Sequence, residues 1–181
     1  MKAWRGLGWL GALVLAASLQ AGDAPAAAVI RLLRDGGAVS YADKVPYGGG
    51  IAAMYLGYDA SGAPVVGVAT RQTKTYRESL AVVSVAAAEG GFRIAAAEIP
   101  EIGQFHGKSQ DYARETLRDI AGRTLADEAA ARGLVDTVTG ATKYRQAIYV
   151  SYSLMASRII REMQAKPDWQ RQALPAEAAG D

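Results

Sequence analysis

The sequence contains no cysteine and a single histidine, His106, among its 181 residues. The absence of cysteine excludes disulfides, thiolate metal sites, iron–sulfur clusters, c-type haem attachment, a cysteine nucleophile and a lipoprotein anchor. A metal centre built from histidine is implausible with only one such residue. The sequence therefore predicts no metal site.

An excess of one charge is also lacking. The chain has 20 lysines and arginines against 18 aspartates and glutamates. Lys2 and Arg5 lie in the N-terminal leader, ahead of the first acid, Asp23, so removal of the leader leaves 18 basic and 18 acidic residues. A neutral body gives no electrostatic reason to bind nucleic acid or an anionic membrane surface. We therefore expect no nucleic-acid partner.

Long apolar runs are scarce, and the clearest one lies at the N-terminus. Lys2 and Arg5 precede an apolar run from Leu7 to Leu19, and small residues then allow cleavage after Ala21 or Ala26. The run is shorter than the ~20 residues that a membrane-spanning helix needs. Residues 1–26 are therefore predicted to be a cleaved export signal rather than a retained N-terminal anchor. Either one places the body in the periplasm or on the outer side of the cytoplasmic membrane.

The body of the chain, residues 27–167, shows strand patterns followed by helix patterns, which predicts an α+β domain. A first hairpin is expected around the turn Asp59–Gly62 and a second around residues 89–91. Together these hairpins predict a small antiparallel sheet packed with helices. The four expected strands are Ile51–Tyr58, Val65–Thr73, Ser79–Ala88 and Phe92–Ile99.

Helices are expected at residues 26–34, at 110–120 with Ser109 as the N-cap, at 125–131, and over a long stretch that starts at or just after Thr139. One face of this last helix is apolar, and core packing is its predicted use. Pro167 ends it, and residues 168–181 are expected to form a flexible tail. The apolar face comprises Ile148, Tyr152, Met155, Ile159 and Met163.

The stretch Asp136–Thr142, which reads DTVTGAT, stands directly before the long helix. In the simpler interpretation Thr139 caps the helix, Gly140 and Ala141 allow close packing, and Thr142 is a polar surface residue. The free backbone N–H groups and the dipole of a helix start also favour an anion, and a phosphate on Thr142 would lie among these donors. The residues permit both interpretations.

The pattern D-x-x-[S/T]-G-A-[T/S] resembles the flavinylation motif of the FMN-binding domain family. That family includes the G subunit of the Rnf complex and the C subunit of the sodium-pumping NADH:quinone reductase. The helix after the motif and, more loosely, the hairpin Ile51–Thr73 are also similar to the family. The family's glycine-rich turn after the second strand is replaced here by QTKTYRE, so the resemblance assigns no clamp residues around the flavin.

The resemblance implies that a flavin transferase joins FMN through its phosphate to Thr142. Asp136, Thr139, Gly140 and Ala141 would form the frame that the transferase recognises. The protein would then be an electron carrier, or a subunit of an oxidoreductase, rather than a stand-alone enzyme. Its implied partners are the flavin transferase and a redox partner protein or membrane complex, and no residue of the chain itself is expected to be catalytic.

Two alternatives stay open from the sequence alone. The chain could be a cofactor-free exported binding or interaction module in which TGAT is only a helix cap, or a flavin reductase that acts directly on a small acceptor. Other side chains that could contact a flavin or its phosphate are His106, Tyr144, Tyr149, Tyr152, Lys143 and Arg145, with Arg71 and Lys74 if the hairpin packs on the helix. Glu98 and Glu101 form a weak candidate acid–base pair.

Overall fold

The structure is a computed structural model that describes residues 24–74, 78–137 and 143–175. The expected export signal, residues 1–26, lies almost entirely outside these ranges. Within them, no helix has both the length and the apolar character needed to cross a bilayer.

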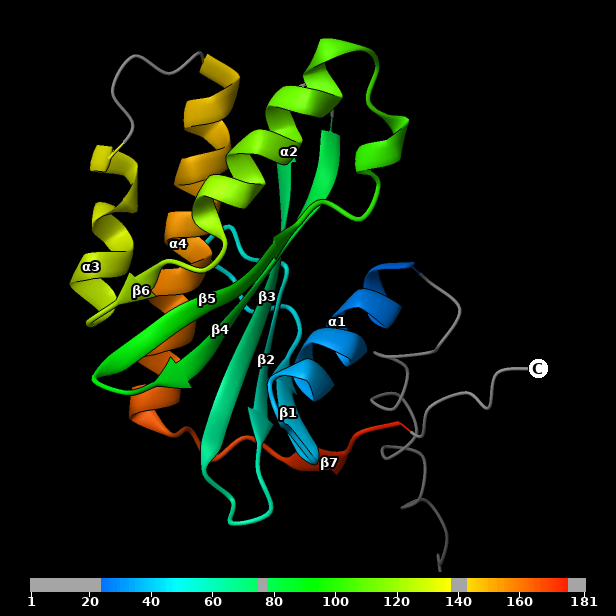
Figure 1. The fold of residues 1–181 in the computed structure, drawn as a ribbon. Coiled ribbons are helices and arrows are strands. Elements are labelled where there is room, and N and C mark those ends of the chain that lie inside the picture. Colours follow the sequence, from blue (N-terminus) through cyan, green and yellow to red (C-terminus); the bar gives the residue numbers. More distant parts are fainter. Residues whose placement is uncertain (1–23, 75–77, 138–142, 176–181) are drawn as a thin grey trace, which may run out of the picture.

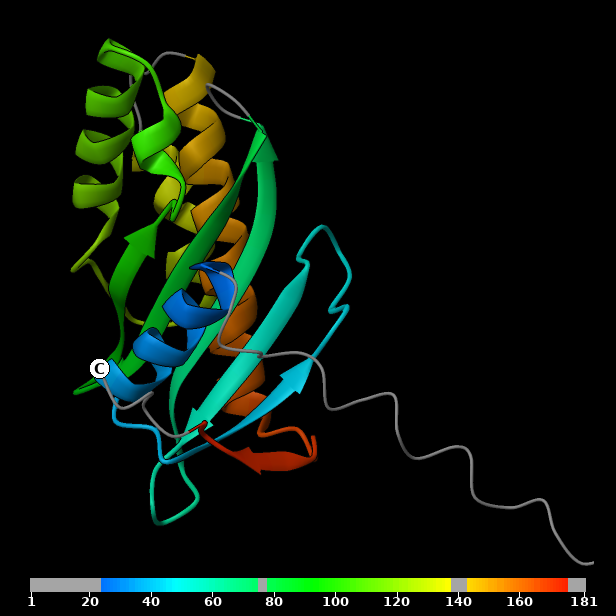
Figure 2. The same cartoon turned by 90° about the vertical axis from the view of Figure 1, so that its right-hand side faces the viewer.

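The described residues form one antiparallel sheet whose strand order is β6-β5-β4-β3-β2-β1-β7. Strands β1 to β5 therefore follow one another in space as they do in the chain, and the two short strands extend the edges. Figure 2 shows β7 beside β1 at one of these edges. The strands are β1 Ser40–Lys44, β2 Ala53–Tyr58, β3 Pro64–Lys74, β4 Glu78–Ala88, β5 Gly91–Glu98, β6 Thr124–Leu125 and β7 Arg171–Ala173.

Helices cover both faces of the sheet unequally (Figure 1). The long helix α4 crosses one face together with α2 and α3, whereas α1 is the one helix among the described residues on the other. The α-helices of the described chain are α1 Ala24–Asp35, α2 Lys108–Ile120, α3 Glu128–Arg132 and α4 Lys143–Ala165, and the short 3-10 helices are η1 Ile102–Gln104 and η2 Gly133–Thr137.

Alternation along the strands divides the apolar side chains into two cores. On β3, Val66 and Val68 face α1, whereas Ala69 faces α4. Burying both faces in this way stabilises the sheet, because apolar surface is removed from water on each side. The larger core contains every member of the predicted apolar face of α4, and all five are buried: Ile148, Tyr152, Met155, Ile159 and Met163.

The predicted fold class, α+β with an antiparallel sheet packed by helices, is confirmed at that level. The four expected strands correspond to β2–β5. Strands β1, β6 and β7 have five, two and three residues and were not expected, because a run this short shows little alternation. Strand β7 lies inside the segment expected to be a tail, so the sheet extends further toward the C-terminus than the sequence indicated.

Two details of the helices differ from expectation. The N-cap of α2 is Gly107, not Ser109, because Ser109 lies inside the first turn and its hydroxyl donates to the His106 carbonyl. The helix expected at 125–131 begins only at Glu128, where the Asp127 carboxylate accepts a hydrogen bond from the backbone N–H of Ala130 at 2.9 Å. Residues Thr124–Leu125 pair with β5 instead.

Candidate functional site

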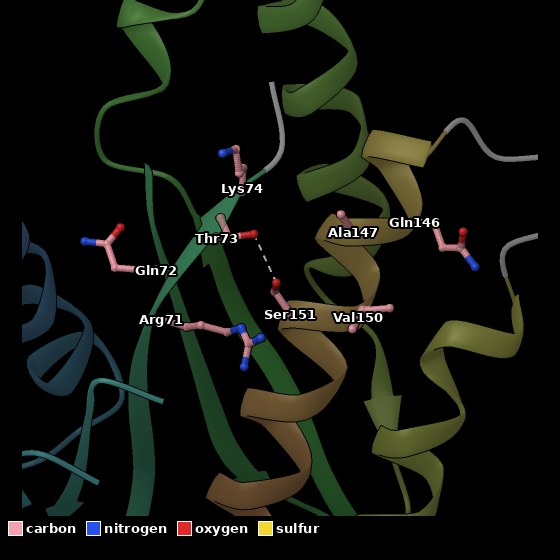
Figure 3. Close-up of a pocket in the computed structure, with 8 residues that line it drawn as sticks. All are labelled: Arg71, Gln72, Thr73, Lys74, Gln146, Ala147, Val150 and Ser151. Atoms are coloured by element: carbon pink, nitrogen blue, oxygen red, sulfur yellow. Dashed lines mark hydrogen bonds between the residues drawn. The ribbon is translucent and has the colours of Figure 1, made fainter. Parts of the chain in front are cut away.

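A hollow of ≈ 470 Å³ lies between the end of β3 and the first turns of α4. We call it the β3–α4 hollow. The first hairpin therefore does pack on the long helix, which is the condition under which Arg71 and Lys74 were expected to approach a cofactor. The lining residues, shown in Figure 3, are Arg71, Gln72, Thr73, Lys74, Gln146, Ala147, Val150 and Ser151.

Hydroxyl groups form a polar floor under this hollow. Thr73 and Ser151 point toward each other, with their oxygens 3.1 Å apart, and both residues are buried (Figure 3). Ser79 lies opposite Thr73 on the neighbouring strand, and its buried hydroxyl has no hydrogen-bond partner among the described residues. An unpaired buried hydroxyl is costly to stability. Ser79 is not among the lining residues, so Thr73 and Ser151 are the residues that bring hydroxyl groups to the hollow.

Arg71 is held in place by the loop that contains three consecutive glycines. Its Nη1 donates to the carbonyl of Gly50 at 3.0 Å. Its Nε is buried and has no partner in the described part of the chain. A loop that was interpreted from the sequence as merely flexible therefore positions a cation at the hollow.

Lys74 is the second cation. Its ammonium lies 3.6 Å from the Glu78 carboxylate, but the two side chains are 82% and 79% exposed. Such an exposed pair contributes little to stability, so the Lys74 ammonium can readily bind another anion in place of Glu78. The hollow thus combines one cation fixed by the backbone with one that is free to reorient.

The DTVTGAT stretch is described only in part. Asp136 is exposed in η2, directly before Thr137. The Thr137 hydroxyl donates to the Leu134 carbonyl at 2.8 Å and accepts from Arg123 Nη1 at 3.0 Å. Thr139, Gly140, Ala141 and Thr142 lie outside the described residues. Helix α4 is described from Lys143, and Gln146 and Ala147 of the hollow follow within its first turns.

The three candidate tyrosines have different environments. Tyr152 is buried, its hydroxyl donates to the Glu98 carbonyl at 2.5 Å, and burial raises its pKa well above the ordinary value. Tyr149 is also buried, with the Arg123 guanidinium 5.8 Å from its ring centre. Both therefore belong to the core, whereas Tyr144 is 47% exposed at the start of α4.

The remaining candidates lie away from the β3–α4 hollow or are engaged elsewhere. His106 is exposed in the turn before α2, and Arg145 forms a salt bridge with Asp119 of α2. Glu98 receives two hydrogen bonds from Arg31 Nη2, at 2.6 and 2.8 Å, from the α1 side of the sheet. Glu98 is thus part of an ion pair that joins α1 to β5, and Glu101 stands at the start of η1.

The residues of the β3–α4 hollow suit an FMN group. Its volume falls within the range of about 300–1,000 Å³ that small-molecule sites occupy. Arg71 and Lys74 can balance the charge of a phosphate, and the hydroxyls of Thr73 and Ser151 can hydrogen-bond to the polar edge of a ring. Ala147 and Val150 offer apolar surface to the face of a flat ring. Gln72, Thr73, Gln146, Ala147, Val150 and Ser151 were not singled out from the sequence. The four residues on α4 could have been identified from the sequence, because they recur at helical spacing beside the apolar face of that helix.

Comparisons with protein-family models, with curated proteins and with solved structures find no match to this chain.

Proposed function

We propose that the protein is an exported electron-transfer flavoprotein that carries FMN joined to Thr142 by a phosphodiester. The observation that carries the proposal is the position of the β3–α4 hollow. It lies against the first turns of α4, the helix that follows the DTVTGAT stretch in the chain, and it contains Arg71 and Lys74. A cofactor tethered just before α4 would therefore have a cationic, partly apolar cavity near its attachment residue.

Five lining residues of the hollow would contact the bound FMN in different ways. Arg71 and Lys74 balance the negative charge of the phosphodiester. The hydroxyls of Thr73 and Ser151 hold the polar edge of the ring, and Ala147 leaves room for its face. When bound, FMN accepts two electrons and can release them one at a time, while the protein sets its orientation and exposure. The fold would then be that of an FMN-binding domain.

Covalent attachment is favoured by the proposed location. Outside the cytoplasm a dissociated cofactor would be lost, whereas a phosphodiester retains it through repeated oxidation and reduction. The attachment needs a flavin transferase, and electron transfer needs a redox partner, either a protein or a membrane complex.

The proposal is tested by producing the chain in the periplasm together with a flavin transferase. After denaturation, the protein should fluoresce under ultraviolet light on a gel and should show the mass increment of FMN. Thr142→Ala should abolish both signals, and Thr142→Ser should retain them because the hydroxyl nucleophile remains. Thr137→Ala, which changes a variable position of the motif, is the matched control and should still be labelled.

A chain that stays unlabelled beside an active transferase would overturn the proposal. That result would favour a cofactor-free interaction module in which TGAT is a helix cap. A label that persists in Thr142→Ala would refute the attachment residue.

A further inference from the structure

A second hollow, of ≈ 460 Å³, lies where the end of β5 meets η1 and α2. We call it the β5–α2 hollow. It shares no lining residue with the β3–α4 hollow, and nothing in the proposed flavin chemistry uses it. Its lining residues are Ala97, Glu98, Ile99, Pro100, Ile102, Arg114, Leu117 and Arg118.

Most of the lining is apolar. Ala97, Ile99 and Leu117 are buried members of the larger core, and Ile102 packs against that core while remaining partly accessible. These buried side chains form the base of an open cavity, where Pro100 and Ile102 keep part of their apolar surface exposed. A ligand in the cavity would remove that apolar surface from water. Such a surface fits the apolar part of a small molecule.

Two arginines supply the charge of this hollow. Arg114 and Arg118 stand one turn apart on α2 and are exposed. Arg118 Nε reaches only the carbonyl of Arg114, at 3.4 Å, and neither guanidinium forms a salt bridge within the described part of the chain. Guanidinium groups bind carboxylates and related anions through paired hydrogen bonds.

The acid in the lining does not cancel this charge. Glu98 is paired with Arg31 of α1, at 2.6 Å, so its carboxylate is already balanced from the other side of the sheet. An anion that reaches Arg114 and Arg118 therefore meets two cations without a carboxylate partner among the described residues.

We propose that the β5–α2 hollow binds a small anionic amphiphile, a molecule with an apolar ring or short chain and one carboxylate or sulfonate. The apolar part lies against Ala97, Ile99 and Leu117, and the acid group lies between Arg114 and Arg118. The site is independent of the flavin and is present whether or not Thr142 is modified.

The test uses the purified whole protein and the fluorescent probe 8-anilinonaphthalene-1-sulfonate. Its fluorescence should rise and saturate at one probe per chain, and octanoate should displace it more strongly than octanol, which has no charge. The double variant Arg114→Gln/Arg118→Gln should weaken probe binding by about tenfold or more, because the charge-assisted hydrogen bonds are lost. Arg93→Gln, an exposed arginine of β5 outside the hollow, is the matched control and should bind as the wild type does.

Backbone and methyl NMR shifts during the octanoate titration locate the site. They should change at Ala97, Ile99 and Leu117 and should be the same in Thr142→Ala, so that failure of the flavin proposal leaves this test unaffected. Shifts centred on Ala147 and Val150, or an affinity unchanged in the double variant, would overturn the inference. Failure of the probe to saturate would overturn it as well.

Discussion

At Gly50 the backbone has a φ of +82°, which glycine adopts far more readily than residues with a side chain. A Cβ at this position would lie 2.5 Å from Arg71 Nη1, the atom that donates to the Gly50 carbonyl. The neighbouring Gly49 has a φ of +60°, and an added Cβ there would meet nothing within 4 Å. The two glycines therefore share a backbone requirement, but only Gly50 leaves room for Arg71.

This difference gives a prediction at the scale of single residues. Both Gly50→Ala and Gly49→Ala should cost about 1 kcal/mol of stability from backbone strain. In urea unfolding the two variants should differ little, because the flexible end of Arg71 can move aside in Gly50→Ala. On the flavin-loaded protein Gly50→Ala should therefore change flavin fluorescence and reduction potential in the same direction as Arg71→Gln, whereas Gly49→Ala should leave both near the wild-type values.

A flavin fluorescence and a reduction potential that are both unchanged in Gly50→Ala would show that Gly50 does not make room for Arg71. The NMR signal of the Arg71 side-chain N–H groups reports the same displacement without the flavin, so it remains informative if the flavin proposal fails.

At the scale of elements, β3 and α4 approach each other closely at Gly67. A Cβ at this position would overlap the Cγ2 methyl of Ile159, which is a buried side chain of α4. The absence of a side chain on Gly67 thus sets the distance between the strand and the helix that form the β3–α4 hollow further along.

We expect Gly67→Ala to destabilise the protein by about 1–3 kcal/mol, the usual cost of overpacking a core. Ile159→Ala should cost about 2–5 kcal/mol because it leaves a cavity. Since the second change removes the atom with which the first collides, the double variant should lose less stability than the two single losses added together. Chemical denaturation of the two single variants and the double variant measures the coupling free energy between residues 67 and 159.

Gly103→Ala is the matched control for the Gly67 series, because a Cβ there meets nothing within 4 Å and should leave stability almost unchanged. Strictly additive losses for Gly67→Ala and Ile159→Ala would contradict the close approach of β3 to α4.

Elements with a long repeating pattern were predictable from the sequence. The segments on either side of the Asp59–Gly62 turn indicated β2 and β3, and helical spacing indicated the buried face of α4. Strand β7 was not predictable, because its three residues carry no apolar alternation and its partner β1 lies about 130 residues earlier in the chain.

For the candidate site, the sequence proposes an attachment residue but not the hollow. The motif in which Thr142 is the proposed acceptor is contiguous in sequence, so it can be recognised without a fold. The hollow beside α4 depends on which residue of β3 faces which turn of α4, and its polar floor depends on the register that places Thr73 opposite Ser79. Such pairings join residues that are far apart in the chain, so they produce no local pattern in the sequence.

For the whole molecule, the balance of charge provides a sensitive test of flavin attachment. A phosphodiester adds one negative charge, and removal of the predicted leader would leave 18 basic and 18 acidic residues. With one histidine and no cysteine, few side chains titrate near neutral pH to oppose a change in charge. We therefore expect the loaded protein to focus at a clearly lower isoelectric point than Thr142→Ala.

Lys108→Gln, made in the unloaded Thr142→Ala background, calibrates this shift because it removes one positive charge from an exposed position. In isoelectric focusing under native conditions, the isoelectric points of the loaded protein and of this Lys108→Gln variant should both lie below that of Thr142→Ala by the same amount. A loaded protein that focuses with the unloaded one would contradict attachment through a phosphodiester.

The order of the strands also has a consequence for folding. Each of β1 to β5 pairs with the strand that follows it in the chain, whereas Ser40 of β1 pairs with Ala173 of β7. Local pairings close short loops and form quickly, and a pairing across most of the chain closes a long one. A chain whose N-terminal part becomes available first can therefore form the sheet one hairpin at a time. The edge beside β1 stays open until the last strand arrives, so addition of β7 completes the sheet.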